Sequence, residues 1–457
     1  MKRLFGTSGI RGVFGEDLAP GKILDIGLAI GTYYGIGSRA LVGWDCRLSS
    51  PAIVSIVVGG LLSSGVKVER AGLVSTPALQ KYIQDHNKYD FGLIITASHN
   101  PPEYNGIKLI GSNGLEEDIE VEDQIQRIME KRGFSIVKWN SAGEVFENQE
   151  VPSYYAEKLF EHLTSEARES RFKIVLDYVN CASIITIPLF LNRLEKQLDI
   201  VNLNHDLDGR FPNRPSEPKP DNLKDLRRIV IESNSDFGVG FDGDGDRALV
   251  VDEKGNVWWG DALGTVIAKY LRDNGHEIDS VVTPVTSSSL VDMILEPVGI
   301  KVIRTRVGAK NIVREMRRRK SVLGFEENGG IIYGPHVYTR DGGITTVFVM
   351  NMLAFYKKTL SEIMSIVPKL HQLKDKVRIV SRGDIEAILA EVEEKLGKDA
   401  YDIDRTDGVK IYYDIDRWLL VRPSGTEPII RIFSEAPSEE EAYRIVEKAK
   451  RIVKKYV

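Results

Sequence analysis

Residues 91–108 read FGLIITASHNPPEYNGIK. Five apolar residues, typical of a buried strand, lead directly into Ser98, His99 and two prolines, whose rings stiffen the loop backbone. The stretch therefore presents the Ser98 hydroxyl just past the end of a strand. Such a hydroxyl accepts a phosphoryl or acyl group when a neighbouring group activates it. The alternative is a serine that caps a helix or turn, with His99 hydrogen-bonded to it.

Short apolar strands and helical runs alternate on both sides of this stretch. Residues 40–45 and 66–71 are typical of strands, whereas residues 50–63 and a run that begins at Thr76 are typical of helices. The same order recurs twice, with strands predicted at 173–179, 200–204, 237–241, 280–285, 301–306 and 322–325, and helices at 184–194, 220–232, 289–295 and 309–319. Alternation of this kind predicts mostly parallel sheets with helices on both faces.

The C-terminal part follows a different pattern. Strands are predicted at 377–380, 408–413, 417–421 and 429–433, and helices at 384–396 and 439–457. Because only a short turn joins the second of these strands to the third, we expect antiparallel pairing in an α+β module.

The chain is therefore expected to be an α/β protein of four domains around a central cleft. Three are related βαβαβ-type domains with mixed sheets, and the fourth is a smaller C-terminal α+β domain. The predicted boundaries are 1–149 for the domain with Ser98, 150–256 and 257–369 for the next two, and 370–457 for the last.

Composition excludes several classes of protein. The 457 residues are 42% hydrophobic and 28% charged, as in globular proteins of several domains. A formal net charge of -5, with acids and bases intermixed, argues against nucleic acid or a membrane as partner. The two cysteines, Cys46 and Cys181, lie far apart in the sequence and imply neither a disulfide framework nor a zinc site. A cytoplasmic location is therefore expected.

Polar loops follow the third strand of each predicted unit. Ligands of open α/β sheets bind beyond the carboxyl ends of the strands. The loops are TASHNPP at 96–102, DGDGDR at 242–247 and EENGG at 326–330, and the C-terminal module adds RPSGTEP at 422–428. Four loops of different chemistry at strand ends predict one shared site.

The second loop places Asp242, Asp244 and Asp246 at alternate positions, separated by glycines. A hard divalent cation makes such a density of carboxylates tolerable. A calcium EF-hand loop is a competing pattern, but Arg247 stands at the position where that loop requires glycine. A solvated acidic turn is the third interpretation. Three carboxylates leave Mg²⁺ with open coordination positions, which phosphate groups commonly fill.

The fourth loop offers a guanidinium, two hydroxyls and a closely approachable backbone, from Arg422, Ser424, Gly425 and Thr426. These groups favour a phosphate-binding cradle, and an ordinary surface turn is the alternative.

The third loop brings a carboxylate, Glu326, and an amide, Asn328, which can hydrogen-bond the vicinal hydroxyls of a sugar. A solvent-facing ion pair of Glu326 or Glu327 is the alternative interpretation.

Together these motifs resemble the α-D-phosphohexomutase superfamily, which includes phosphoglucomutase, phosphomannomutase and phosphoglucosamine mutase. The resemblance spans nearly the whole chain and rests on GTSGIRG at 6–12, TASHNPPEYNGIK at 96–108, PSEPKPDNL at 215–223, DGDGDR at 242–247, TRVGAK at 305–310, EENGG at 326–330 and RPSGTEP at 422–428. Members have four domains around a central cleft, and the EENGG form looks like that of archaeal members.

The resemblance implies a role for each matching residue. Ser98 carries a phosphoryl group, and its phosphate together with Asp242, Asp244 and Asp246 holds one Mg²⁺ per chain. The other catalytic residues implied are Arg11, His99, Lys108 and Arg247. The implied substrate-binding residues are Lys310, which helps admit the substrate, Glu326 and Asn328 at the sugar, and Arg422, Ser424, Gly425 and Thr426 at its distal phosphate.

One position departs from the pattern of many relatives, whose sugar loop reads G-E-x-S-G-H. Asn328 stands in place of the serine and Gly330 in place of the histidine. The role of that histidine is vacant at position 330 unless the nearby His336 supplies it.

The predicted activity is a phosphohexomutase that interconverts hexose 1-phosphate and hexose 6-phosphate of the glucose or mannose type. The reaction would use a phosphoserine and a bisphosphorylated sugar intermediate, with a hexose 1,6-bisphosphate as activator. Phosphoglucosamine mutase is the alternative, ahead of a metal-dependent sugar-phosphate phosphatase and a non-catalytic sugar-phosphate sensor. The expected partners are hexose phosphates, and the expected state is a monomer or a homodimer.

Overall fold

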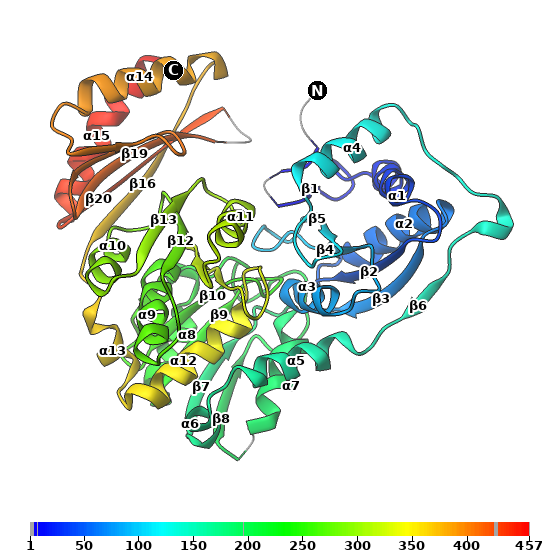
Figure 1. Ribbon diagram of the computed structural model, residues 1–457, viewed down its shortest axis with the longest axis horizontal. Helices are drawn as coiled ribbons and strands as arrows, with labels where there is room; N and C mark the ends of the chain where they lie inside the picture. The colour runs from blue at the N-terminus through cyan, green and yellow to red at the C-terminus, as the bar shows by residue number, and fades with distance from the viewer. Residues whose placement is uncertain (1–3, 7, 195, 425–427, 457) are drawn as a thin grey trace. The chain divides into compact units, whose positions relative to one another are not determined.

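The computed structural model of the chain describes residues 4–6, 8–194, 196–424 and 428–456 (Figure 1). Four sheets are present in these residues. The chain forms two compact units, Met1–Trp258 with Asn328–Ile363 and Trp259–Glu327 with Met364–Val457. The prediction of three α/β domains and a C-terminal domain with an antiparallel sheet is confirmed. In the described residues, no helix is both long and apolar enough to span a membrane.

The first sheet of the first unit has six strands. In spatial order they are β1 (Ile10–Val13), β5 (Tyr104–Gly111), β4 (Phe91–Ile95), β2 (Arg39–Trp44), β3 (Lys67–Leu73) and β6 (Val145–Glu147). Strands β2, β3 and β4 pair parallel, as expected, but β5 pairs antiparallel with both β4 and β1. The sequence did not predict β5, because its glycines and its lysine interrupt the apolar pattern.

Helices cover both faces of this sheet (Figure 1). They are α1 (Pro20–Tyr34), α2 (Ser50–Ser63) and α4 (Ile119–Glu130) on one face and α3 (Thr76–Asp85) on the other. Alternate strand residues such as Val42 and Leu93 join the core under α1 and α2. Their neighbours Gly43 and Gly92 face α3, where a Cβ at Gly92 would lie 2.3 Å from a side-chain carbon of Ile83. Glycine therefore lets α3 pack closely on the strands.

The second sheet of the first unit has the spatial order β11 (Val257–Trp258), β10 (Ala248–Asp252), β9 (Phe237–Phe241), β7 (Phe172–Asp177) and β8 (Leu198–Leu203). Helix α8 (Lys224–Glu232) packs on it, and the predicted start at 220 is instead a short 3₁₀ turn. Strands β9 and β10 pair antiparallel, so residues 242–247 form the turn of a hairpin. We call this turn the metal hairpin. Its alternate side chains, those of Asp242, Asp244 and Asp246, lie close together.

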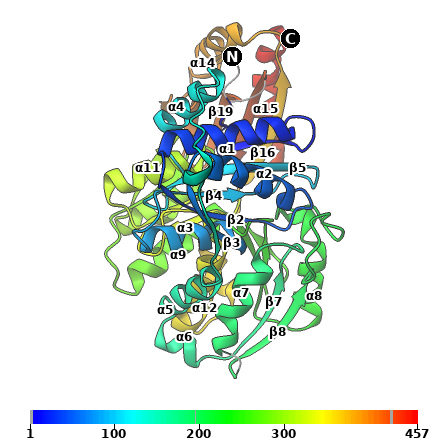
Figure 2. The same cartoon turned by 90° about the vertical axis from the view of Figure 1, so that its right-hand side faces the viewer.

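The first unit contains further helices. They are α5 (Val151–Glu161), α6 (Ser165–Glu169), α7 (Ser183–Leu191) and α12 (Gly342–Tyr356). Helix α5 contacts α7 and α12, and α12 also contacts α6 (Figure 2). Strand β15 (Ile331–Tyr333) and helix α13 (Leu360–Ile363) belong to the same unit.

The second unit holds the parallel strands β12 (Ser280–Pro284), β13 (Lys301–Thr305) and β14 (Leu323–Phe325), with helices α9 (Gly260–Asp273), α10 (Leu290–Leu295) and α11 (Ala309–Arg319). Its C-terminal sheet is antiparallel, in the order β16 (His371–Arg378), β20 (Ile429–Ala436), β19 (Arg417–Pro423), β18 (Val409–Asp414) and β17 (Asp402–Asp404). Helices α14 (Ile385–Leu396) and α15 (Glu439–Val453) pack on this sheet.

The two cysteines correct one expectation. Cys46 and Cys181 form a disulfide, with their Cα atoms 5.1 Å apart across 135 residues of sequence. Cys46 follows β2 and Cys181 follows β7, and the fold of the first unit brings these two strand ends together. Sequence separation gave no sign of this pairing, so the interpretation that the two cysteines imply no disulfide was wrong. The ground it offered for a reducing cytoplasm no longer holds.

Candidate active site

The Ser98 loop leaves β4 in a strained conformation. Ser98 has φ 52°, in the left-handed region that non-glycine residues rarely adopt. Its backbone N–H donates to Thr96 Oγ1 at 2.9 Å, and this hydroxyl donates to Asp45 Oδ2 at 2.7 Å. Ser98 and Asp45 are both buried. Through Thr96, the carboxylate of Asp45 therefore holds the loop in place. Asp45 lies just past the end of β2, the strand next to β4.

Arg47 holds the same loop by its carbonyl groups. The guanidinium is fully buried, and its Nη2 donates to the carbonyls of Ser98 at 2.8 Å and Asn100 at 2.6 Å. Its Nη1 donates to two more carbonyls of the loop, and its Nε pairs with Asp45 at 3.0 Å. Sequence reasoning missed both residues. Two opposite charges directly after a buried strand, in WDCRLSS, were the available signal.

The metal hairpin meets the Ser98 loop directly. Ser98 Oγ donates to Asp242 Oδ2 at 2.7 Å, although the two residues are 144 positions apart. One ligand atom from each of Asp242, Asp244 and Asp246 lies within 4.8 Å of the others, and all three residues are buried. The structure thus brings together the serine and the three aspartates that the sequence singled out.

Cationic side chains surround these carboxylates. Lys108 Nζ lies 2.7 Å from Asp244 Oδ2 and 3.3 Å from Asp246 Oδ2. Burial alone would lower the pKa of Lys108, but the two carboxylates outweigh it and raise that pKa, so Lys108 stays protonated. Arg340, which the sequence did not single out, donates to Asp246 Oδ2 at 2.5 Å. Arg247 lies beside Asp246, with 3.8 Å between Nε and Oδ1.

The aspartates fit a divalent cation. Oδ1 of Asp244 and Oδ1 of Asp246 are buried and have no hydrogen-bond partner among the described residues. Burial, followed by repulsion from Asp244 and Asp246, raises the pKa of Asp242 well above its usual range. Carboxylate oxygens that face one another without protons or donors are what a bound Mg²⁺ neutralises.

His99 lies beside Ser98 but carries no charge. Its Nδ1 is 3.3 Å from Ser98 Oγ. The Arg247 guanidinium, then burial and then Arg11 lower the pKa of His99 to about 2. Arg11 reaches the loop through Nη1, which donates to Asn100 Oδ1 at 2.9 Å. The neutral imidazole can exchange hydrogen bonds with the serine but holds no proton to give as an imidazolium.

The predicted substrate residues divide between the two units. Lys310 is in the first turn of α11, Glu326 follows β14 and is buried, and Arg422 is near the end of β19, all in the second unit. Arg422 pairs with Asp407 Oδ2 at 3.0 Å through Nε and at 2.8 Å through Nη2.

The other predicted substrate residues belong to the RPSGTEP loop and the EENGG loop. The backbone N–H of Ser424 donates to the carbonyl of Ile429 at 2.8 Å, whereas Gly425 and Thr426 lie outside the described residues. Asn328 is in the first unit, and its Oδ1 accepts a hydrogen bond from the backbone N–H of Gly330 at 3.2 Å.

His336, the candidate replacement for the sugar-loop histidine, is occupied elsewhere. It is fully buried, its Nδ1 lies 3.1 Å from His162 Nε2, and its Nε2 lies 3.3 Å from Asp341 Oδ2. Burial, then His336, lowers the pKa of His162 to about 4, so the pair of rings carries no charge from His162 at neutral pH. His336 therefore belongs to the interior of the first unit.

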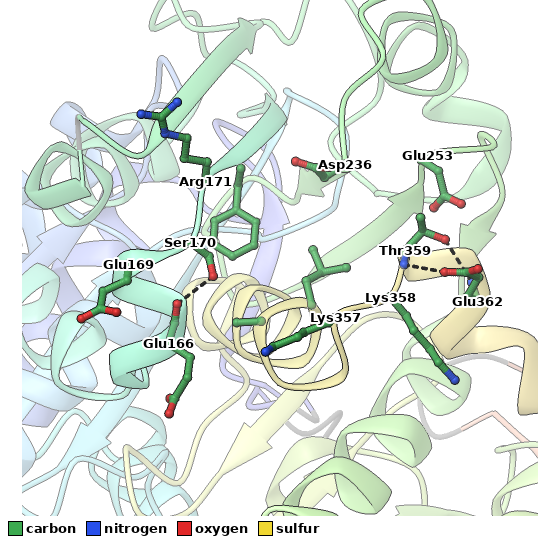
Figure 3. A pocket seen from close by; sticks show the side chains of 13 residues that line it. Glu166, Glu169, Ser170, Arg171, Asp236, Glu253, Lys357, Lys358, Thr359 and Glu362 are labelled. Carbon is green, nitrogen blue, oxygen red and sulfur yellow. Dashed lines mark hydrogen bonds between the residues drawn. The ribbon is translucent and has the colours of Figure 1, made fainter.

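A surface cavity of about 730 Å³ lies elsewhere in the first unit (Figure 3). Its lining includes Glu166, Arg171, Asp236, Lys357 and Lys358, and it shares no residue with the predicted site. Figure 3 shows acidic and basic side chains from several elements around it, and they do not converge on one point. We therefore place the chemistry at the Ser98 loop and the metal hairpin.

A buried serine, three carboxylates and a ring of cations suit an enzyme that transfers phosphoryl groups with the help of a metal ion. Comparison with known families agrees. The phosphoglucomutase/phosphomannomutase models match as alpha/beta/alpha domain I at residues 2–135, domain II at 153–255, domain III at 259–370 and the C-terminal domain at 376–452.

Individual proteins match over nearly the full length. The chain is 41% identical to the phosphoglucomutase/phosphomannomutase of Thermococcus kodakarensis, with 98% of this chain and 97% of the relative covered. It is 38% identical to the phosphoglucosamine/phosphogalactosamine mutase of Sulfurisphaera tokodaii, with 99% of each covered. A crystal structure of a phosphoglucomutase/phosphomannomutase family protein from Burkholderia thailandensis matches with a TM-score of 0.86 at 23% identity, covering 100% of this chain and 98% of that chain.

The chain therefore belongs to the phosphoglucomutase/phosphomannomutase family, within the α-D-phosphohexomutase superfamily. It is a phosphohexomutase, an intramolecular phosphotransferase of the isomerase class.

Proposed function

We propose that the chain interconverts hexose 1-phosphates and hexose 6-phosphates of the glucose or mannose type, with Ser98 as the phosphoryl carrier. The observation that carries this proposal is the 2.7 Å contact between Ser98 Oγ and Asp242 Oδ2. It sets the acceptor hydroxyl against the one cluster of carboxylates, among the described residues, that is built for a metal ion. A phosphorylated Ser98 would face that metal with its phosphate oxygens.

The transfer is an exchange of one ester for another. The Ser98 O–P bond breaks as a bond forms between the phosphorus and a free sugar hydroxyl, whose proton is lost while the departing Ser98 oxygen gains one and becomes a hydroxyl again. The hexose bisphosphate then turns, and its other phosphate returns to Ser98, which leaves the isomeric monophosphate. Mg²⁺, held by Asp242, Asp244 and Asp246, supplies charge neutralisation at the transferring phosphoryl group when bound.

The chain's own residues orient and stabilise the reacting groups. Lys108 is held protonated by Asp244 and Asp246, so it acts as a fixed positive charge for the transition state. Arg11 and Arg247 add two guanidinium groups around His99, which stays neutral. Ser98 and Asp242 are fully buried, and exclusion of water from such a position favours transfer to sugar over hydrolysis. In the second unit, Arg422 and Ser424 would hold the distal phosphate, with Lys310 and Glu326 at the substrate.

A second candidate is phosphoglucosamine mutase, because the Sulfurisphaera tokodaii relative carries that activity in its name at 38% identity. A panel of glucose, mannose and glucosamine 1-phosphates, compared by kcat/KM, separates the two candidates. A preference for the amino sugar by tenfold or more would replace the proposed assignment.

The phosphoserine is tested with Ser98→Ala and the control Ser64→Ala, which alters a buried serine outside the site. We expect a hexose 1,6-bisphosphate to activate the native protein and to add the mass of one phosphoryl group, on Ser98, by intact-mass analysis. Ser98→Ala should gain no mass and lose isomer formation, while Ser64→Ala keeps both. Full turnover in Ser98→Ala would refute the proposal. Release of inorganic phosphate without isomer would indicate a phosphatase, and phosphate binding without turnover would indicate a sensor.

A further inference from the structure

The segment 328–343, which we call the clasp segment, grips the metal hairpin at three points. The backbone N–H of Ala248 donates to the carbonyl of Gly329 at 3.1 Å, and the N–H of Gly342 donates to the carbonyl of Gly245 at 3.1 Å. Between these two backbone contacts, Arg340 Nη2 donates to Asp246 Oδ2 at 2.5 Å. The clasp segment and the metal hairpin belong to the same compact unit.

The backbone that carries Arg340 is fixed. Asp341, the next residue, caps α12 by accepting from the N–H groups of Gly343 at 2.7 Å and Ile344 at 3.0 Å. The hydroxyl of Tyr155 donates to the same carboxylate oxygen at 2.5 Å. The N–H of Asp341 donates to the carbonyl of Ile331 at 2.9 Å. Arg340, itself 5% exposed, therefore extends from an anchored position.

The path of the Arg340 side chain explains the glycine at position 330. A Cβ at Gly330 would lie 2.4 Å from Arg340 Cδ and 2.9 Å from Arg340 Cγ. Gly330 does not have a positive φ, so its backbone would accept other residues. The space at position 330 is filled by the stem of Arg340, whose head group reaches the aspartate.

We propose that Arg340 is a positioning residue of the metal centre. Its guanidinium fixes Asp246 through Oδ2 and so directs Oδ1, which has no hydrogen-bond partner among the described residues, towards a divalent cation. Gly330 is the steric condition for this arrangement, and the two residues form one functional pair. The proposal rests on the metal site of the proposed function, but it concerns metal binding, which is measurable without any sugar.

The first test keeps the positive charge at position 340 and removes the planar guanidinium with its paired N–H donors. Arg340→Lys retains a cation and the stem over Gly330 but cannot present the same planar donor. Calorimetric titration of the full-length protein with Mn²⁺, as a probe for Mg²⁺, should show affinity weakened about 10-fold or more, the range for residues that orient metal ligands. The matched control is Arg405→Lys, whose ion pair with Glu393 lies on the surface and which should bind Mn²⁺ as the native protein does.

The second test reaches the same contact by another route. Gly330→Ala inserts a methyl group into the path of Arg340 and should weaken Mn²⁺ binding to a similar extent. In an Arg340→Ala background there is no stem to displace, so the same Gly330→Ala change should have no further effect on affinity. This non-additivity distinguishes the pair from two independent residues.

A purely structural role gives a different result. If Arg340 and Gly330 only stabilise the fold, Arg340→Lys and Gly330→Ala should lower the melting temperature and leave the Mn²⁺ affinity of the folded protein unchanged. That outcome overturns the proposal. Equal costs of Gly330→Ala in the native and Arg340→Ala backgrounds would also overturn it. If the native protein forms no isomer but the variants lose Mn²⁺ affinity as expected, the proposed function fails and the role of Arg340 stands.

Discussion

The Ser98–Asp242 region of the first unit and the Arg422 loop of the second both carry polar residues at strand ends, with Arg422 itself in β19, but they hold charge differently. Ser98, Asp242 and Asp244 are fully buried, and each carries contacts from more than one loop. Arg422 is partly exposed, and its guanidinium pairs with Asp407. The backbone N–H of Val307 donates to the same Asp407 carboxylate at 3.1 Å.

The first region is a permanent site, whose contacts stay in place, whereas the Arg422–Asp407 pair is an exchangeable one, whose contact a ligand can replace. A buried set of charges is stable only when every member has its partner, so the first region has to be built complete before substrate arrives. A ligand phosphate can compete with Asp407 for the Arg422 guanidinium, because both offer negatively charged oxygens to the same donors. We infer that the first region performs the transfer, whereas the Arg422 loop binds and releases one end of the sugar phosphate.

The largest effect is expected from the metal hairpin. Asp242→Asn should lower turnover by roughly 10³-fold, because it removes a charge from the cation site and replaces one carboxylate oxygen beside the Ser98 hydroxyl with an amide nitrogen. The same variant should unfold at the same or a higher temperature in the absence of metal, because burial, followed by repulsion from Asp244 and Asp246, raises the pKa of Asp242 and makes its charged form unfavourable. Steady-state kinetics and calorimetric melting with a chelator measure the two effects.

The matched control for this prediction is Asp208→Asn, which changes an aspartate that hydrogen-bonds Arg210 on the surface. It should alter neither turnover nor melting. If Asp242→Asn keeps native turnover, the first region is not the permanent site described above.

An intermediate effect is expected at Arg47. Arg47→Lys cannot serve the carbonyls of Ser98 and Asn100 together with Asp45, so the Ser98 loop should lose its fixed position. We expect kcat to fall by about 10²-fold with little change in KM, because the loop binds the transferring group and not the distal phosphate. The free energy of unfolding should drop by about 3 kcal/mol, since buried polar groups lose their partners.

Arg70→Lys serves as the control for Arg47, because Arg70 pairs with Glu147 near the surface. The kinetic constants and the denaturant midpoint are measured for both variants. A change in KM alone would show that Arg47 affects substrate binding instead of the serine.

The smallest effect is expected at the exchangeable pair. Arg422→Gln should raise KM for a hexose 1-phosphate by about 10-fold and change kcat less, since it removes a charge-assisted contact to the distal phosphate. Asp407→Asn should lower KM by a few fold, because the guanidinium no longer has a competing carboxylate. Arg417→Gln, which breaks an ion pair with Glu441 on the same domain, is the control. Opposite shifts in KM for the first two variants support an exchangeable contact, and shifts in the same direction would contradict it.

Local patterns in the sequence predicted most of the elements near the site. Apolar runs of five or six residues gave β2, β4 and β9, and the proline after Thr76 marked the start of α3. One strand was missed because its own apolar pattern is interrupted. Strand β5 contains glycines and a buried Lys108, and its place in the sheet follows from pairing with β4 and β1.

The sequence by itself determined the chemistry of this protein: a serine in a stiff loop, three alternating aspartates and a guanidinium loop, each just past a strand. Only the tertiary structure decided which of these groups meet. The Ser98 contact with Asp242, the disulfide of Cys46, the clamp of Arg47 and the Arg340–Gly330 pair all join residues far apart in the sequence or depend on the direction of a side chain. The physical reason is that strand and helix periodicity are local, whereas strand pairing and the packing of side chains across sheets involve the whole fold.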